Sequence, residues 1–183
     1  EAMKAGKYSI ARRYAEEAEE QARNAARHAK ESQYVERVEE ARDTIQQASE
    51  EGARYFNVED LASLAKRLQQ IKKSYSTEQY ETYSVKLDKL ENDLYTMAKD
   101  TPDVFNKIQQ SQRELYEGLK DRGAVQFAEE KMVEADQHLR YASMDFDKNM
   151  FRSSYRNLKQ AAMILSDIDL EYEERAFVQR MRE

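Results

Sequence analysis

Apolar residues recur along this chain at alternating three- and four-residue steps, the spacing that places side chains on one face of an α-helix. We call each such row of side chains a seam. Four seams are each led by an aromatic residue or a leucine: Tyr8, Ala11, Ala15, Ala18, Ala22, Ala25, Ala29; Leu61, Leu64, Leu68, Ile71, Tyr75; Phe105, Ile108, Gln112, Leu115, Leu119; Phe151, Ser154, Leu158, Ala161, Leu165. Further seams with the same spacing lie between them, so nearly the whole chain is predicted to be helical packing surface.

The composition agrees with an all-α fold. The 183 residues include only four glycines and one proline, and 36% are charged while 40% are hydrophobic. Such a balance is typical of long helices and coiled coils, in which few residues interrupt regular structure. We therefore predict a single all-helical domain over residues 1–183, an antiparallel array of about seven long helices. It forms either a helical-hairpin solenoid or an elongated bundle.

Cap-forming and helix-breaking residues predict where each helix begins and ends. The first helix covers about residues 4–30, and Ser32 caps a second helix that ends near Ala48. The remaining helices begin at Asn57, at Ser76 with Gln79 in capping-box spacing, at Thr101 followed by Pro102, near Val125, and at Asp147 or Asn149. Asp121, Arg122 and Gly123 end the helix that starts after Thr101.

The helices show a weak internal repeat. A shift of 94 residues carries Ala41 onto Ala135 and Leu64 onto Leu158, and successive seams suggest a two-helix unit of roughly 47 residues. On this interpretation the helix over residues 4–30 lacks a preceding partner helix. The chain, which starts at Glu1, is then a fragment of a longer protein, or this helix packs on another copy. The alternative is an array with no missing part.

The residues Gly6 to Ala11, followed by Ala15 and Ala18, resemble the second helix of a tetratricopeptide-type repeat. Phe151, Ser154, Leu158 and Ala161 repeat the spacing, and alanine-rich helical-hairpin domains of bacterial envelope proteins are similar too. The resemblance covers about a third of the chain. It departs from the repeat family in its long helices, in its lack of tryptophan and in the absence of a proline that closes each unit. It implies protein–protein interaction and transfers no binding residue.

The chain carries no recognisable catalytic or metal-binding motif. It has no cysteine, and its four glycines are too scattered for a phosphate-binding loop. A di-iron helical bundle needs Glu-x-x-His pairs, but alanine stands three residues before both His28 and His138. We therefore predict no enzyme activity, no cofactor and no metal. The net charge of −6 disfavours nucleic acid as a partner.

Two groups of residues remain as candidate partner contacts. The first is the alanine stripe, Tyr8, Ala11, Ala15, Ala18, Ala22, Ala25 and Ala29. Alanine lets two helices approach closely but buries little area. The stripe therefore packs inside the protein, helped by Ile10 and Tyr14, or contacts a partner. The second group is Tyr75, Tyr80 and Tyr83, which line a groove for a ligand or simply occupy their seam.

These observations predict a non-enzymatic helical scaffold for protein–protein interaction or self-assembly. The alternative is a ligand-binding or enzymatic helical domain with a pocket between helices around the three tyrosines. No apolar run is long enough for a transmembrane segment. The compartment stays open, with the resemblance pointing to the bacterial cell envelope and the cytoplasm as the alternative.

Overall fold

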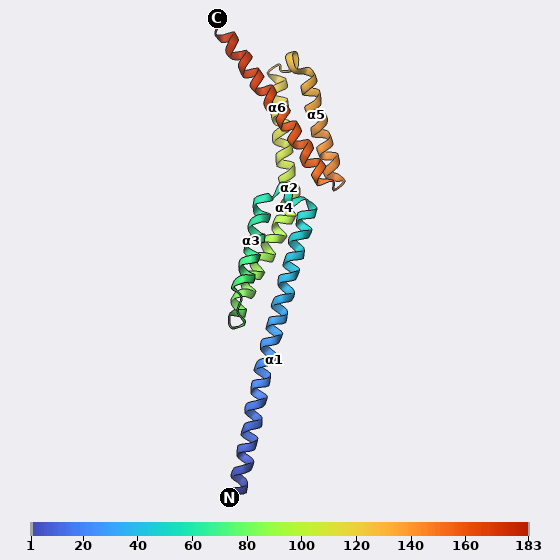
Figure 1. Ribbon diagram of the computed structural model, residues 1–183. Helices are drawn as coiled ribbons and strands as arrows, with labels where there is room; N and C mark the ends of the chain where they lie inside the picture. The colour runs from blue at the N-terminus through green and yellow to red at the C-terminus, as the bar shows by residue number, and fades with distance from the viewer. Residues whose placement is uncertain (1, 183) are drawn as a thin grey trace. The chain divides into compact units, whose positions relative to one another are not determined.

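A computed structural model describes residues 2–182, with side chains from residue 7 onward, and shows an all-α protein (Figure 1). Over these residues there is no strand, and five long helices replace the predicted seven: α1 (Ala2–Ala48), α3 (Val58–Ser74), α4 (Tyr80–Asp121), α5 (Val125–Asp147) and α6 (Phe151–Arg180). A π-helix, η1 (Ser49–Ala53), and the short helix α2 (Arg54–Phe56) follow α1, and a 3₁₀ turn, η2 (Thr77–Gln79), precedes α4.

The predicted break at Ser32 is wrong, because α1 passes through it without interruption. Residues 7–51 contain neither glycine nor proline, so nothing in the backbone forces the helix to stop. A serine that would cap a helix is also tolerated on the surface of one. The predicted helices over residues 4–30 and 32–48 are therefore one helix.

The predicted break at Thr101 and Pro102 is also wrong, because Pro102 lies inside α4. A proline removes one backbone hydrogen bond and strains the preceding turn. Here the carbonyl of Met97 in that turn accepts hydrogen bonds from the Thr101 hydroxyl, at 3.1 Å, and from the Asn57 side-chain amide, at 3.2 Å. Asn57 also donates to the Thr101 hydroxyl at 3.1 Å. These buried side chains bond to the Met97 carbonyl, which neighbours the Ala98 carbonyl that the missing Pro102 amide leaves without its helical donor.

Three other predicted breaks occur where the backbone requires them. Gly52, with φ of 106°, ends the first long helix within η1. At the end of α4, Gly123 has φ of 87°, and the amides of Gly123 and Ala124 bond back to Lys120 and Leu119 as in a Schellman motif.

Asn149 has φ of 58° and ends α5 in the same way, so α6 begins at Phe151 rather than at Asp147 or Asn149. Ser76 does precede η2, but it makes no side-chain capping hydrogen bond. The predicted capping box between Ser76 and Gln79 is therefore wrong.

The chain divides into two compact units. The first contains residues up to Ile45 together with Ser63–Asp93, so it combines most of α1, most of α3 and the first third of α4. Its core consists of Tyr34, Val38, Ala41, Leu64, Leu68, Ile71, Tyr83, Leu87 and Leu90. Arg37 on α1 lies 2.8 Å from Glu91 on α4, and Arg67 on α3 lies 2.6 Å from Asp93 on α4. The predicted seams that begin at Tyr34, Leu61 and Tyr80 are confirmed by the burial of most of their residues, whereas the seam from Tyr8 to Ala29 is exposed.

The second unit contains Gln46–Ala62 and the chain from Leu94 onward. One core cluster joins the end of α4 to α5 and α6 through Leu119, Met132, Ala135, Leu165 and Ile168. A second cluster contains Phe56, Phe105, Leu139 and Leu158. The Phe105 and Phe146 rings stack 3.9 Å apart, with Phe56 edge-on to both. The unit thus packs α2 onto three long helices.

Candidate interaction surface

Residues 7–33 of α1 contribute no buried side chain to the core of the first unit. Every side chain from Lys7 to Gln33 is exposed, and Tyr34 is the first buried residue of the helix. Within its unit, α1 runs past the turn that joins α3 to α4, with no helix beside its blue end (Figure 1). At about 1.5 Å per residue, residues 7–33 span roughly 40 Å. The interpretation of the alanine stripe as an internal contact is therefore wrong.

Large apolar side chains are exposed at the start of this segment. Tyr8 keeps 76% of its accessible surface, Tyr14 59% and Ile10 50%. Neither Ile10 nor Tyr14 supplies the second internal contact predicted from the sequence. Below them the alanine stripe continues uncovered through Ala11, Ala15, Ala18, Ala22, Ala25 and Ala29. The segment is joined to its unit only near its end, where Lys30 pairs with Glu81 at 3.0 Å and Tyr80 donates to Gln33 at 2.9 Å.

Local interactions hold this segment helical. Arg12 pairs with Glu16 at 2.9 Å, Arg13 with Glu17 at 3.5 Å, and Arg23 with Glu19. Such pairs contribute about 0.2–0.5 kcal/mol each, and alanine has the highest helix propensity of all residues. The packed part of α1 also acts as the nucleus for helix formation. The exposed part therefore extends an existing helix and avoids the cost of nucleation.

The alanine stripe does not face the same way as the packed seam of α1. At 3.6 residues per turn, the stripe from Tyr8 to Ala29 is rotated by roughly 130° from the seam from Tyr34 to Ala48. The side of α1 that contacts α3 and α4 is therefore not the side that carries the stripe. A partner on the stripe would approach a face that this unit leaves open.

Tyr75 and Tyr83 pack within the first unit. The Tyr75 ring stacks on Tyr34 at 3.5 Å, and its edge meets Tyr83 at 5.6 Å. Tyr83 is buried and donates a hydrogen bond to the carbonyl of Ser74. Tyr80 lies half-buried under Lys30, whose Nζ is 5.2 Å from its ring. The structure thus brings Tyr75 and Tyr83 together in the seam and places Tyr80 at the base of the exposed segment.

Two buried hydroxyls of this tyrosine cluster differ in whether they have a hydrogen-bond partner. Tyr34 donates to the carbonyl of Ile71 at 3.1 Å, and burial, followed by the nearby Tyr75 and Tyr83, raises the pKa of Tyr34 to about 12. The Tyr75 hydroxyl is also buried but finds no hydrogen-bond partner among the described residues. The cluster is a packing contact with one unsatisfied polar atom.

The described residues contain no group of three or more side chains arranged to hold a metal ion. His138 Nδ1 lies 3.0 Å from the side-chain oxygen of Asn157, so that nitrogen is occupied. The acidic residues near the end of α6 pair with cations of their own unit: Arg122 contacts Asp169 at 2.6 Å, and Lys131 contacts Glu171 at 3.2 Å. Hydrogen bonds from Arg175 and Lys131 lower the pKa of Glu171.

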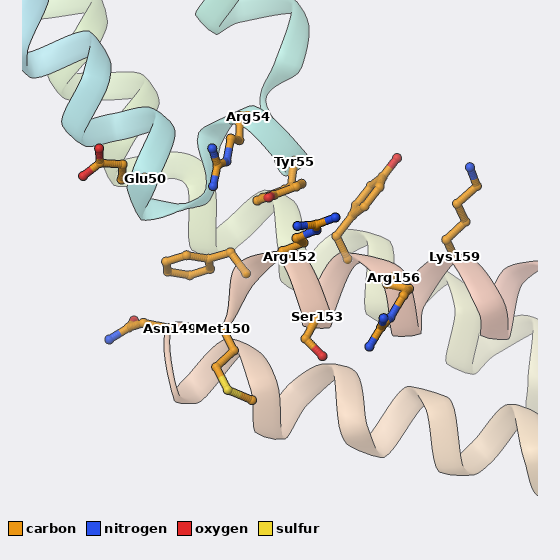
Figure 2. Close-up of a pocket in the computed structure, with 11 residues that line it drawn as sticks. Glu50, Arg54, Tyr55, Asn149, Met150, Arg152, Ser153, Arg156 and Lys159 are labelled. Carbon is orange, nitrogen blue, oxygen red and sulfur yellow. The ribbon is translucent and has the colours of Figure 1, made fainter.

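One cavity of the second unit was not singled out from the sequence. An open hollow of about 670 Å³ lies between α2 and the start of α6 (Figure 2). Its cationic lining residues are Arg54, Arg152, Arg156 and Lys159. Figure 2 shows Arg152 and Lys159 extending from α6 on the side where Arg54 and Tyr55 lie, whereas Arg156 extends the other way.

No protein-family model matches this chain, and no curated protein or solved structure is significantly similar to it. No described helix is both long and apolar enough to cross a membrane.

Proposed function

We propose that this chain is a non-enzymatic interaction protein that presents residues 7–33 of α1 to a helical segment of a protein partner. The observation that carries the proposal is that every side chain over these residues is exposed while the helix continues unbroken into a packed core. The packed part fixes the direction of the helix, and the exposed part offers an unoccupied face.

The stripe has the chemistry of a helix-packing face. Alanine side chains let a second helix approach to about 8 Å between axes. Tyr8 at one end adds the larger aromatic area that the alanines lack. Arginines and glutamates flank the stripe, so a partner with interleaved charges of both signs would complete ion pairs along its length.

A single substitution on the stripe tests this proposal. Ala18→Glu places a large charged side chain in the middle of the stripe, and Asn24→Glu adds the same side chain on the opposite face of the exposed helix. Both positions are exposed, so both variants should unfold at the wild-type temperature. The expected result is that association, measured by sedimentation equilibrium and by quantitative pull-down, is lost in Ala18→Glu and kept in Asn24→Glu.

Whether the chain binds itself or another protein identifies the partner. Concentration-dependent self-association that only Ala18→Glu abolishes assigns the stripe to a second copy, and capture of another protein with the same dependence assigns it to that protein. The proposal fails if the wild type is monomeric at high concentration and no captured protein depends on Ala18.

A further inference from the structure

The open hollow between α2 and the start of α6 has a strongly uneven charge. Four cationic side chains line it against one acid, Glu50, whose carboxylate accepts a hydrogen bond from Gln46 at 3.2 Å. The chain as a whole carries a net charge of −6. The hollow is therefore a basic patch on a protein that is acidic overall. Its local positive charge would attract an anion.

The cations of the hollow have no carboxylate partner. Arg152, Arg156 and Lys159 make no hydrogen bond or ion pair with any described residue, and Arg54 contacts only the Tyr55 ring, at 5.0 Å. Several arginines elsewhere have a carboxylate partner, as Arg122 has in Asp169 at 2.6 Å. The free guanidinium groups of the hollow retain all their donors for a ligand.

The sequence of α6 explains why these cations are free. Arg152, Arg156 and Lys159 follow one another at steps of four and three, so their Cα atoms lie along one side of the helix. From there Arg152 and Lys159 extend toward Arg54 and Tyr55, whereas Arg156 extends the other way (Figure 2). No aspartate or glutamate occurs anywhere in residues 148–166, so no acid can pair with them at helical spacing. Ser154 and Leu158, on the opposite face, are buried, so the cationic face points outward.

Backbone geometry brings Arg54 and Tyr55 to this face. Gly52 has φ of 106°, and a Cβ atom there would lie 3.0 Å from the Phe151 ring, so the close approach of η1 to the start of α6 requires glycine. The rings of Tyr55 and Tyr155 lie 5.7 Å apart within the hollow. Two separate elements thus hold the cations and the aromatic rings in a defined arrangement.

We propose that this hollow binds a small molecule bearing a multiply charged phosphate group. Arginine matches phosphate oxygens through paired N–H donors, and several cations together favour an anion with more than one charge. The volume of about 670 Å³ lies within the range of small-molecule sites. The site is independent of the exposed segment of α1, because all of its lining residues belong to the second unit.

The test is calorimetric titration of the full chain with inorganic triphosphate and, separately, with ATP at low salt. The expected result is saturable binding with a dissociation constant below about 1 mM. The variant Arg54→Ala/Arg152→Ala should weaken binding at least about tenfold. The control, Lys107→Ala/Arg113→Ala, removes two exposed and unpaired cations that do not line the hollow, and it should bind as the wild type does.

A gain of affinity provides a second, independent readout. Glu50→Gln removes the one acid of the hollow and should tighten binding severalfold without touching a cation. Equal affinity for triphosphate and ATP would show that the hollow recognises the phosphate group alone. Tighter binding of ATP would show that the hollow also contacts the adenine base, which would stack on a tyrosine. The proposal is overturned if neither probe binds saturably, or if the control variant loses as much affinity as Arg54→Ala/Arg152→Ala.

Discussion

The side-chain amide of Asn57 donates a hydrogen bond of 3.2 Å to the carbonyl oxygen of Met97, in the turn of α4 that precedes Pro102. Two segments separated by 40 residues in the chain thus meet at the point where the long helix carries its proline. The contact fixes the segment after α2 to α4 at the point where a new helix would be expected to start.

Replacement of Asn57 by alanine should destabilise the protein. The variant removes two buried hydrogen bonds, to the Met97 carbonyl and to the Thr101 hydroxyl, and each contributes about 0.5–1.5 kcal/mol to the free energy of unfolding. Urea denaturation monitored by circular dichroism measures the loss. Asn24→Ala, on the exposed part of α1, is the control and should change stability by less than about 0.5 kcal/mol. Equal stability of the two variants would contradict this role for Asn57.

Two glycine substitutions should have opposite effects. Gly52→Ala introduces a Cβ at positive φ and 3.0 Å from the Phe151 ring, so it should lower the free energy of unfolding by more than about 1 kcal/mol. Gly118 lies inside α4 with nothing within 4 Å of the position of a Cβ atom. Gly118→Ala should therefore raise stability by about 0.5–1 kcal/mol. Thermal unfolding of both variants tests the contrast, and a neutral Gly52→Ala would refute the requirement for glycine.

The two stacked tyrosines should respond differently to loss of their hydroxyls. Tyr34→Phe removes the donor to the Ile71 carbonyl and should cost about 1 kcal/mol. Tyr75→Phe removes a buried hydroxyl that has no partner among the described residues, so stability should stay the same or rise. Chemical denaturation of both variants at pH 7 decides between these outcomes. A larger loss for Tyr75→Phe than for Tyr34→Phe would show that the Tyr75 hydroxyl is bonded in solution.

Stability should fall at alkaline pH in a way that depends on Tyr34. Its pKa is raised to about 12 in the folded protein, against about 10 in the unfolded chain, so the folded state holds a proton that the unfolded state releases. The contribution is fully present below pH 10 and is lost as the pH rises through 12. Urea midpoints measured between pH 9 and pH 12 should fall less steeply in Tyr34→Phe than in the wild type. Parallel curves would contradict the raised pKa.

The ion pairs of α1 should contribute more to the free energy of unfolding where they are more buried. Arg37 is 23% exposed and contacts both carboxylate oxygens of Glu91, at 2.8 and 2.9 Å, with Asp88 at 2.6 Å. A double-mutant cycle on Arg37 and Glu91 should give a coupling energy of about 1 kcal/mol that decreases with added salt. The same cycle on the exposed pair Arg12 and Glu16 should give less than about 0.5 kcal/mol. Equal coupling energies would show that burial does not matter here.

Helical periodicity predicted the core well and the helix ends less well. The seams from Tyr34 to Ala48 and from Tyr83 to Met97 are buried almost as expected, because burial follows local spacing. The breaks at Ser32 and Thr101 were wrong for different reasons. Ser32 has the side chain of a cap but no break in the backbone around it. At Thr101, the helix continues beside Asn57, a residue too distant in the chain for local patterns to reveal.

Of the two candidate sites, one could be seen in the sequence and the other could not. The alanine stripe was visible in the sequence, but its exposure depends on where α3 ends and α4 begins, which spacing alone does not determine. The basic hollow was missed because Arg54 reaches α6 only through the backbone conformation of Gly52. One signal was nevertheless present, since residues 148–166 carry cations and no acid in a chain rich in both.

The alanine stripe and the packed seam lie roughly 130° apart on α1, so different residues of this helix determine association and stability. Substitutions on the stripe by other good helix formers change no buried contact, so they should have little effect in a screen for folding or heat resistance. Their effect would emerge only in the presence of whatever binds there. Binding to the stripe therefore disturbs no packed contact, and a partner that binds only the folded helix raises the apparent stability of this chain by mass action.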